Sequence, residues 1–157
     1  MGIFSFFEKR KPLIVEDEVF GTLQEIRIRG ISTHYFEGKG MFRPLNREIE
    51  YSVACEKKSG PVEEQRQFYE WVQNNYSGLK AKMTPLLEKE LRNWKDDFRI
   101  VNFDAQFFLE YLTIPSFGAT PLLWDMSFRF SENTELGYVV DFTDLEPTSA
   151  ETNDPGL

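Results

Sequence analysis

The chain of 157 residues contains a single cysteine, a single histidine and no long apolar run. The lone Cys55 cannot form an intramolecular disulfide, and no basic, apolar and small-residue signal opens the chain, which disfavours a secreted, disulfide-stabilised protein. No segment approaches the roughly 18 apolar residues that a membrane-spanning helix requires. We therefore expect a protein of a reducing cytoplasm.

The scarcity of histidine and cysteine also limits catalysis. A three-histidine zinc site is impossible, and a catalytic triad or dyad would have to use His34 as its base. A thiolate–imidazolium pair of Cys55 and His34 is the one hydrolase hypothesis, but no nucleophile motif surrounds Cys55. Cys55 instead continues the alternation of Ile49, Tyr51 and Val53, which predicts a small core residue. We expect no enzyme, no catalytic or metal-binding residues and no cofactor.

Basic residues are outnumbered, with 18 Lys and Arg against 26 Asp and Glu, and the net charge is −8. Most of the excess lies late in the chain, because residues 98–144 carry −5 and residues 145–157 carry −3. A negative field repels phosphate backbones and attracts basic surfaces. The charge therefore disfavours nucleic-acid binding and favours a basic partner.

Aromatic residues are abundant, at 15% of the chain, and 15 of them are Phe. A chain of this length is expected to fold as one domain with a substantial core. Two interpretations of the aromatics remain open: a core built on Phe, or an exposed apolar patch that binds a partner or a second copy. The residues concerned are Phe4, Phe6, Phe7, Phe36, Phe42, Phe103, Phe107, Phe108 and Phe117.

Residues 1–12 form a separate apolar and basic segment. Phe4, Phe6 and Phe7 precede Lys9, Arg10 and Lys11. This pattern is typical of a short interfacial anchor, in which residues 3–11 would contact an anionic membrane surface. We favour the alternative that the segment packs on the domain or on a neighbouring chain, because isolated helices of this length are marginal.

Residues 19–54 predict antiparallel strands. Residues 18–29, 31–36 and 48–54 alternate between apolar and polar side chains, with turns at Gly30 and at residues 37–40. The composition changes at Ser59-Gly60-Pro61, where Pro61 followed by Glu63 and Glu64 is typical of a helix start.

Two amphipathic helices are predicted after Pro61. Apolar residues recur at three- and four-residue steps through residues 68–79 and again through residues 79–94, with a break near Asn74-Asn75. Pro85 either kinks the second helix or starts a new one that Thr84 caps. We expect the two helices to lie antiparallel and to pack on one face of the sheet.

Further strands are predicted after residue 100. Residues 101–111 alternate, but Phe108 and Leu112 violate the pattern, so a short helix from Asp104 is an alternative to a strand over residues 104–112. Residues 123–130 and 137–142 predict a hairpin around a polar turn at residues 131–135. The tail, residues 146–157, is acidic and contains proline, and we expect it to be disordered.

The predicted order of strands, helix, helix and strands indicates an α+β fold over residues 13–145, with a mostly antiparallel sheet. Asp125, Asp141 and Asp144 fall near the last hairpin, and pairing of its strands would bring Asp125 close to Asp141. Two carboxylates together could hold Mg²⁺ or Ca²⁺, but their spacing matches no cation-binding loop. We expect solvated carboxylates that, with Phe4, Phe6 and Phe7, are candidates for partner binding.

Three motifs resemble those of a set of small uncharacterised bacterial domains of unknown function. They are a Phe-Gly opening strand (Val19-Phe20-Gly21-Thr22-Leu23), a Glu-Glu-Gln helix (residues 61–68) and a Trp-Asp hairpin (Trp124-Asp125 with residues 135–138). The resemblance spans about residues 19–142. It implies no catalytic residues, and some such domains have contexts suggestive of toxin immunity.

We therefore expect a non-catalytic, cytoplasmic protein-interaction module, either an immunity protein or an accessory protein, that binds a basic partner or associates with itself. The alternatives are a peripheral membrane protein anchored by residues 3–11 and a hydrolase that uses Cys55 and His34. The sequence does not indicate a small-molecule ligand.

Overall fold

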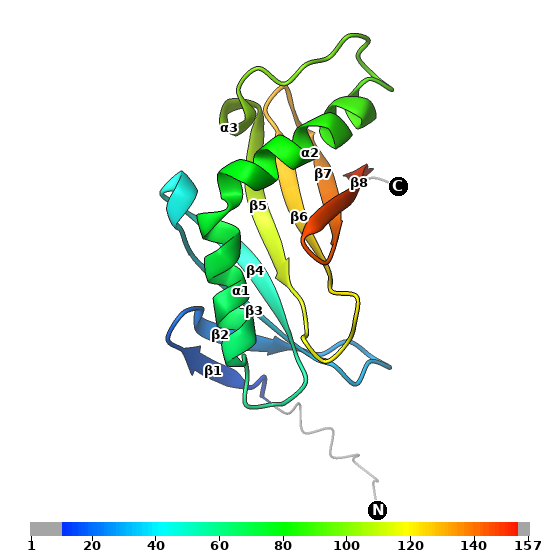
Figure 1. Ribbon diagram of the computed structural model, residues 1–157. Coiled ribbons are helices and arrows are strands. Elements are labelled where there is room, and N and C mark those ends of the chain that lie inside the picture. Colours follow the sequence, from blue (N-terminus) through cyan, green and yellow to red (C-terminus); the bar gives the residue numbers. More distant parts are fainter. Residues whose placement is uncertain (1–10, 154–157) are drawn as a thin grey trace, which may run out of the picture.

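The structure is a computed structural model that describes residues 11–153 (Figure 1). It consists of one eight-stranded sheet and three α-helices. The elements, in chain order, are β1 (Ile14–Asp17), β2 (Gly21–Ile26), β3 (His34–Phe42), a 3₁₀ turn (Arg43–Leu45), β4 (Arg47–Cys55), α1 (Glu63–Asn74), α2 (Tyr76–Leu91), α3 (Phe103–Gln106), β5 (Phe107–Ile114), β6 (Leu123–Phe130), β7 (Asn133–Thr143) and β8 (Glu146–Asn153).

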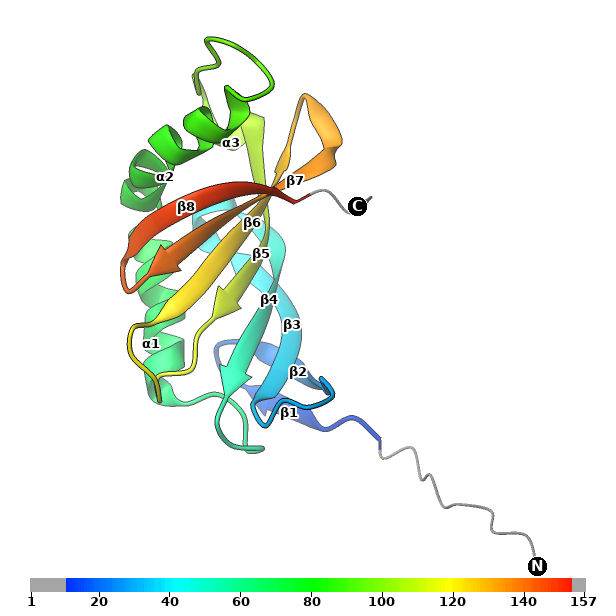
Figure 2. The ribbon, with the colours of Figure 1, turned by 90° about the vertical axis from the view of Figure 1, so that its right-hand side faces the viewer.

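The strands lie in the sheet in the order in which they occur in the chain. Neighbouring strands are antiparallel, except that β4 and β5 are parallel and are connected through α1 and α2. A parallel pair requires such a crossover, because a hairpin can only reverse the chain. Both helices cover the same face of the sheet (Figures 1 and 2). The predicted order of strands, helices and strands and the mostly antiparallel sheet are confirmed.

The expectation that the two helices lie antiparallel is wrong. Only Asn75 separates α1 from α2, and α2 continues across the sheet from the end of α1 (Figure 1). One residue is too short a connection to reverse the chain between packed helices. Pro85 lies inside α2 and does not end it, while the Thr84 hydroxyl donates to the Lys80 carbonyl at 2.8 Å.

The turn predicted at residues 37–40 is wrong, because β3 runs through these residues without a break. Gly38 and Gly40 are required by packing across the sheet. A side chain at Gly38 would place its Cβ 2.7 Å from Leu23 Cδ2, and one at Gly40 would place its Cβ 2.7 Å from the Tyr51 hydroxyl. The chain reverses later, at the 3₁₀ turn and Asn46, whose φ of 49° is left-handed.

Both alternatives for residues 104–112 hold in part. A single helical turn, α3, ends at Gln106, and β5 begins at Phe107. The irregular alternation in β5 has a structural cause, because the pairing with β6 shifts between Leu109 and Tyr111. This β-bulge at Glu110 changes the side-chain parity, so that Leu109 and Leu112 both face the helices.

The expected disorder of the acidic tail is wrong for residues 146–153. These residues form β8, which pairs antiparallel with β7. The backbone N–H and the hydroxyl of Thr152 donate to Glu90 on α2 at 3.2 and 2.8 Å. Backbone pairing with β7 and the hydrogen bonds to Glu90 therefore stabilise β8, although it has few apolar side chains.

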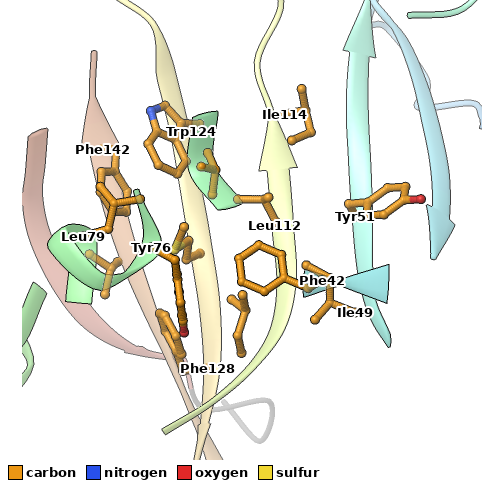
Figure 3. Close-up of a cluster of buried hydrophobic side chains, with 14 of the residues drawn as sticks. Phe42, Ile49, Tyr51, Tyr76, Leu79, Leu112, Ile114, Trp124, Phe128 and Phe142 are labelled. Atoms are coloured by element: carbon orange, nitrogen blue, oxygen red, sulfur yellow. The ribbon is translucent and has the colours of Figure 1, made fainter. Parts of the chain in front are cut away.

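The core is built largely from aromatic side chains between the helices and the sheet (Figure 3). Trp124 stacks on Phe142 with ring centroids 3.9 Å apart, and Phe68 of α1 meets Trp124 edge-on at 4.9 Å. Such pairs contribute about 0.5–1.5 kcal/mol beyond their buried area. Among the described residues, the Phe-rich core is therefore the correct interpretation for Phe36, Phe42 and Phe107, which are buried.

Candidate functional site: the open face of the sheet

One face of the sheet is not covered by helices in the part of the chain that the structure describes (Figure 2). We call it the open face. Its side chains alternate with the buried ones along β3 to β8, and the strand register places them together. They include Tyr35, Glu37, Lys39, Met41, Glu48, Glu50, Phe108, Glu110, Tyr111, Asp125, Arg129, Val139, Asp141 and Glu151, with Leu123 at the edge. Arg47, at the start of β4, has the parity of the buried Ile49 but lines a hollow of this face with Glu48.

Carboxylates dominate the charge of the open face. Seven carboxylates stand against three cations, Lys39, Arg47 and Arg129. Lys39 lies 3.6 Å from Glu48, and Arg129 forms an ion pair with Glu110. Such exposed pairs contribute little to stability. The remaining carboxylates give this face a net negative potential.

Two adjoining hollows of about 440 and 390 Å³ lie in the open face, and both are lined by Lys39, Glu50 and Tyr111. The Tyr111 hydroxyl donates to Glu37 Oε1 at 3.0 Å, which fixes the ring between the two hollows. Burial raises the pKa of Tyr111 to about 12, so the phenol is neutral and remains a donor at pH 7. The hollows are therefore polar and suited to hydrogen-bonding groups.

Exposed apolar side chains also lie on the open face, outside the hollows. Met41 at the end of β3 is 56% exposed, and Leu123 at the start of β6 is 67% exposed. Phe108 is half-buried, with the Arg47 guanidinium 5.5 Å from its ring centroid. Aromatic and apolar residues of this kind anchor protein interfaces.

The predicted proximity of Asp125 and Asp141 is confirmed, because the two residues are direct partners in the β6–β7 register. The Thr113 hydroxyl donates to Asp125 at 3.1 Å, and the Ser149 hydroxyl donates to Asp141 at 3.0 Å. Burial raises the pKa of Asp125, and the charge of Asp141 raises it further, although the Thr113 hydrogen bond opposes both. Asp125 is thus protonated more easily than an ordinary aspartate.

Asp144 lies away from this pair and has a structural role. It occupies the β7–β8 turn with a left-handed φ of 53°. Its carboxylate accepts the Leu122 N–H at 3.0 Å, and its carbonyl accepts the Trp124 indole N–H at 2.7 Å. Asp144 therefore holds the turn and does not join the other two carboxylates in one cluster.

No group of three or more His, Cys, Asp or Glu able to hold a metal ion occurs within residues 11–153. None of the described helices is long and apolar enough to cross a membrane. The other candidate partner-binding residues, Phe4, Phe6 and Phe7, lie outside the described residues.

Cys55 and His34 are direct partners in the β3–β4 register, a proximity that the sequence analysis did not anticipate. The Cys55 side chain is buried, and burial raises the pKa of its thiol to about 12. The His34 ring instead approaches Glu25, with Nδ1 3.5 Å from Oε1. A neutral buried thiol is a poor nucleophile, so this arrangement does not favour a thiolate–imidazolium pair.

Sequence reasoning missed Lys39, Glu50 and Tyr111, which line both hollows. The signal for Glu50 was present, because it alternates with the buried Ile49 and Tyr51. Lys39 was assigned to a turn, and Tyr111 was placed on the buried parity, since the bulge at Glu110 was not anticipated. Comparisons with protein-family models, with curated proteins and with solved structures found no match for the chain.

Proposed function

We propose that this chain is a non-catalytic protein-interaction module that binds a basic partner on the open face. The observation that carries the proposal is the excess of carboxylates on a sheet face without a helical cover. Electrostatic attraction of this kind speeds encounter and selects partners of opposite charge. An immunity or accessory role would use the same face.

The apolar side chains at the rim support the same proposal. Charged groups set the rate and the specificity of association, whereas aromatic and apolar anchors carry most of the affinity. Met41 and Leu123 are exposed apolar side chains of the open face, and Met41 is the register partner of Glu48, which lines the first hollow. A partner segment with basic side chains beside an apolar one would match this surface.

The test is capture of partners from cells that carry the gene, with the native chain and two charge-reversal variants. E50K/E151K alters the open face, and both residues are exposed. E64K/D96K changes the net charge equally but lies on α1 and in the loop after α2. Any protein captured by the native chain is then purified and its Kd is measured at low and high salt.

We expect the native chain and E64K/D96K to retain one basic partner with the same Kd. E50K/E151K should weaken binding by at least about tenfold at low salt, and the difference should shrink at high salt. Equal binding by both variants would refute the open face as the site. Capture of an acidic partner or of none would refute the proposed function.

A further inference from the structure

A second surface of the chain has the opposite charge. We call it the basic end: Lys11, Arg27, Arg29, Lys57 and Lys58, with the apolar side chains Ile28 and Ile31. The start of β1, the β2–β3 loop and the β4–α1 loop meet at this end of the molecule, in the lower part of Figures 1 and 2. All seven residues are exposed.

The basic end is a continuous surface. Two hollows of about 430 and 330 Å³ are both lined by Arg27 and Lys58. Ile28, Arg29 and Ile31 line the first hollow, and Lys11 lines the second. Residues far apart in the sequence therefore contribute to one patch.

Few carboxylates oppose these cations. No Asp or Glu occurs from residue 26 to residue 36. Glu25 faces the patch, but its side chain is largely buried and is engaged by the Leu13 N–H, His34 and Arg27. Glu56 in the β4–α1 loop accepts the Ser116 hydroxyl at 3.2 Å. The cations that line the two hollows, Lys11, Arg27, Arg29 and Lys58, thus face only Glu25 among the carboxylates of that lining, in a chain whose net charge is −8.

The apolar residues of the loop are placed among the cations. Ile28 and Ile31 are 47% and 49% exposed, and Ile28 lies between Arg27 and Arg29 in the sequence. An exposed β-branched side chain flanked by guanidinium groups matches the boundary between acyl chains and anionic headgroups. A soluble polyanion would match the cations but would leave the two isoleucines without a partner.

The sequence that precedes the described residues has a composition similar to that of the basic end. Ten residues precede Lys11, and they include Phe4, Phe6, Phe7, Lys9 and Arg10. Whatever their structure, they attach where Lys11 lies, beside the hollow that Arg27 and Lys58 line. The sequence that joins the described chain at Lys11 is thus itself aromatic and basic.

We propose that the basic end docks on an anionic lipid bilayer, with Arg27, Arg29 and Lys58 against the headgroups and Ile28 and Ile31 at the acyl boundary. This proposal does not rest on the proposed function, since the two surfaces share no residue. Stable attachment of a peripheral protein generally takes two signals, and this end combines a basic patch with exposed apolar side chains.

The experiment is co-sedimentation of the full chain with vesicles of phosphatidylcholine alone and with about one third phosphatidylserine. R27E/R29E reverses two cations of the basic end, and K89E/R99E makes the same charge change on exposed residues elsewhere. I28N/I31N removes the apolar pair without changing the charge. Circular dichroism and a thermal melt establish that each variant is folded.

We expect binding to the anionic vesicles only, a loss of at least about tenfold for R27E/R29E, and native binding by K89E/R99E. I28N/I31N should bind several-fold more weakly, and the deficit should persist at high salt. If R27E/R29E does not fold, vesicle binding by I28N/I31N alone tests the proposal. Equal binding to neutral vesicles, native binding by the decisive variants, or retention on heparin without vesicle binding would overturn the proposal.

Discussion

Arg66 of α1 donates two hydrogen bonds to Oδ2 of Asp17, from Nε at 3.0 Å and from Nη2 at 2.9 Å. Asp17 ends β1, and its Oδ1 accepts the backbone N–H groups of Val19 and Phe20. The Asp17 side chain is only 2% exposed. This carboxylate therefore joins the first helix to the first edge of the sheet and also forms the β1–β2 turn.

Asp17→Asn should lower the free energy of unfolding by about 2 kcal/mol at pH 7, because it removes a buried charge partner of Arg66. Urea denaturation measures the change. The exposed neighbouring substitution Glu18→Gln is the control and should change stability by less than about 0.5 kcal/mol. Equal effects of the two substitutions would contradict this role of Asp17.

The Asp17 carboxylate should also make the free energy of unfolding depend on pH in the acid range. Burial raises the pKa of Asp17, but the hydrogen bonds from Arg66, Phe20 and Val19 outweigh it and leave the pKa below its ordinary value. A carboxyl with a depressed folded-state pKa stabilises the fold above its unfolded pKa, and this contribution is lost as pH falls through the folded pKa. The difference in stability between the native chain and Asp17→Asn should therefore shrink below about pH 4. A constant difference down to pH 2 would contradict the assignment.

Two glycines should respond to alanine in opposite directions. Gly38→Ala would force a Cβ against Leu23 Cδ2 and to 3.0 Å from the Thr22 carbonyl, and should destabilise the chain by about 1–3 kcal/mol. Gly78→Ala, inside α2 and with open space around it, should stabilise the chain by about 0.5–1 kcal/mol. Thermal unfolding of both variants checks the pair, and a stabilising Gly38→Ala would refute the packing argument.

Tyr76 has a buried hydroxyl without a hydrogen-bond partner among the described residues. Its ring packs edge-on against Phe42 with centroids 5.0 Å apart, so the ring is needed and the hydroxyl is not. Tyr76→Phe should leave stability unchanged or raise it by about 1 kcal/mol in urea denaturation. Tyr51→Phe is the contrast, because the Tyr51 hydroxyl donates to the Phe20 carbonyl and its loss should destabilise. A Tyr76→Phe variant as destabilised as Tyr51→Phe would show that the Tyr76 hydroxyl is satisfied.

Asp125→Asn should stabilise the chain at pH 7 by about 0.5–1 kcal/mol, because burial disfavours the charged carboxylate and the like charge of Asp141 directly opposite repels it. Because the pKa of Asp125 is raised and that of Asp17 is lowered, the two carboxyls change the free energy of unfolding with pH in opposite directions. The folded state binds the proton of the Asp125 carboxyl more tightly than the unfolded state does. Ionised Asp125 therefore destabilises the fold, and this destabilisation is absent at low pH and grows as pH rises through the raised pKa. The gain in Asp125→Asn should therefore disappear below about pH 4. A gain in stability that is the same at pH 3 and pH 7 would refute ionisation of Asp125 as its cause.

The elements with regular periodicity were predictable from the sequence. Pro61, Glu63 and Glu64 marked the start of α1, and the alternation in residues 123–130 and 137–142 predicted the β6–β7 hairpin. Asp125 and Asp141 could be paired because a hairpin determines which residues face each other. These features depend on local sequence and short turns.

The missed features depend on contacts between distant segments. The glycines of β3 resemble a turn until Tyr51 and Leu23 are known to pack against them. β8 is polar, and its order comes from pairing with β7 and from Glu90 of α2, neither of which its own composition reveals. The open face required the position of the bulge at Glu110, because a single inserted residue changes which side chains it presents.

The parallel junction between β4 and β5 divides the strand pairings into two kinds. All other pairs join consecutive strands across loops of two to eight residues, so each can form from contacts nearby in the sequence. Only β4 and β5 require the chain to close a loop of more than 50 residues, and that closure costs the most entropy. Two four-stranded ribbons can thus form early and independently. We expect their union, once the helices dock across the seam, to be the slow step of folding.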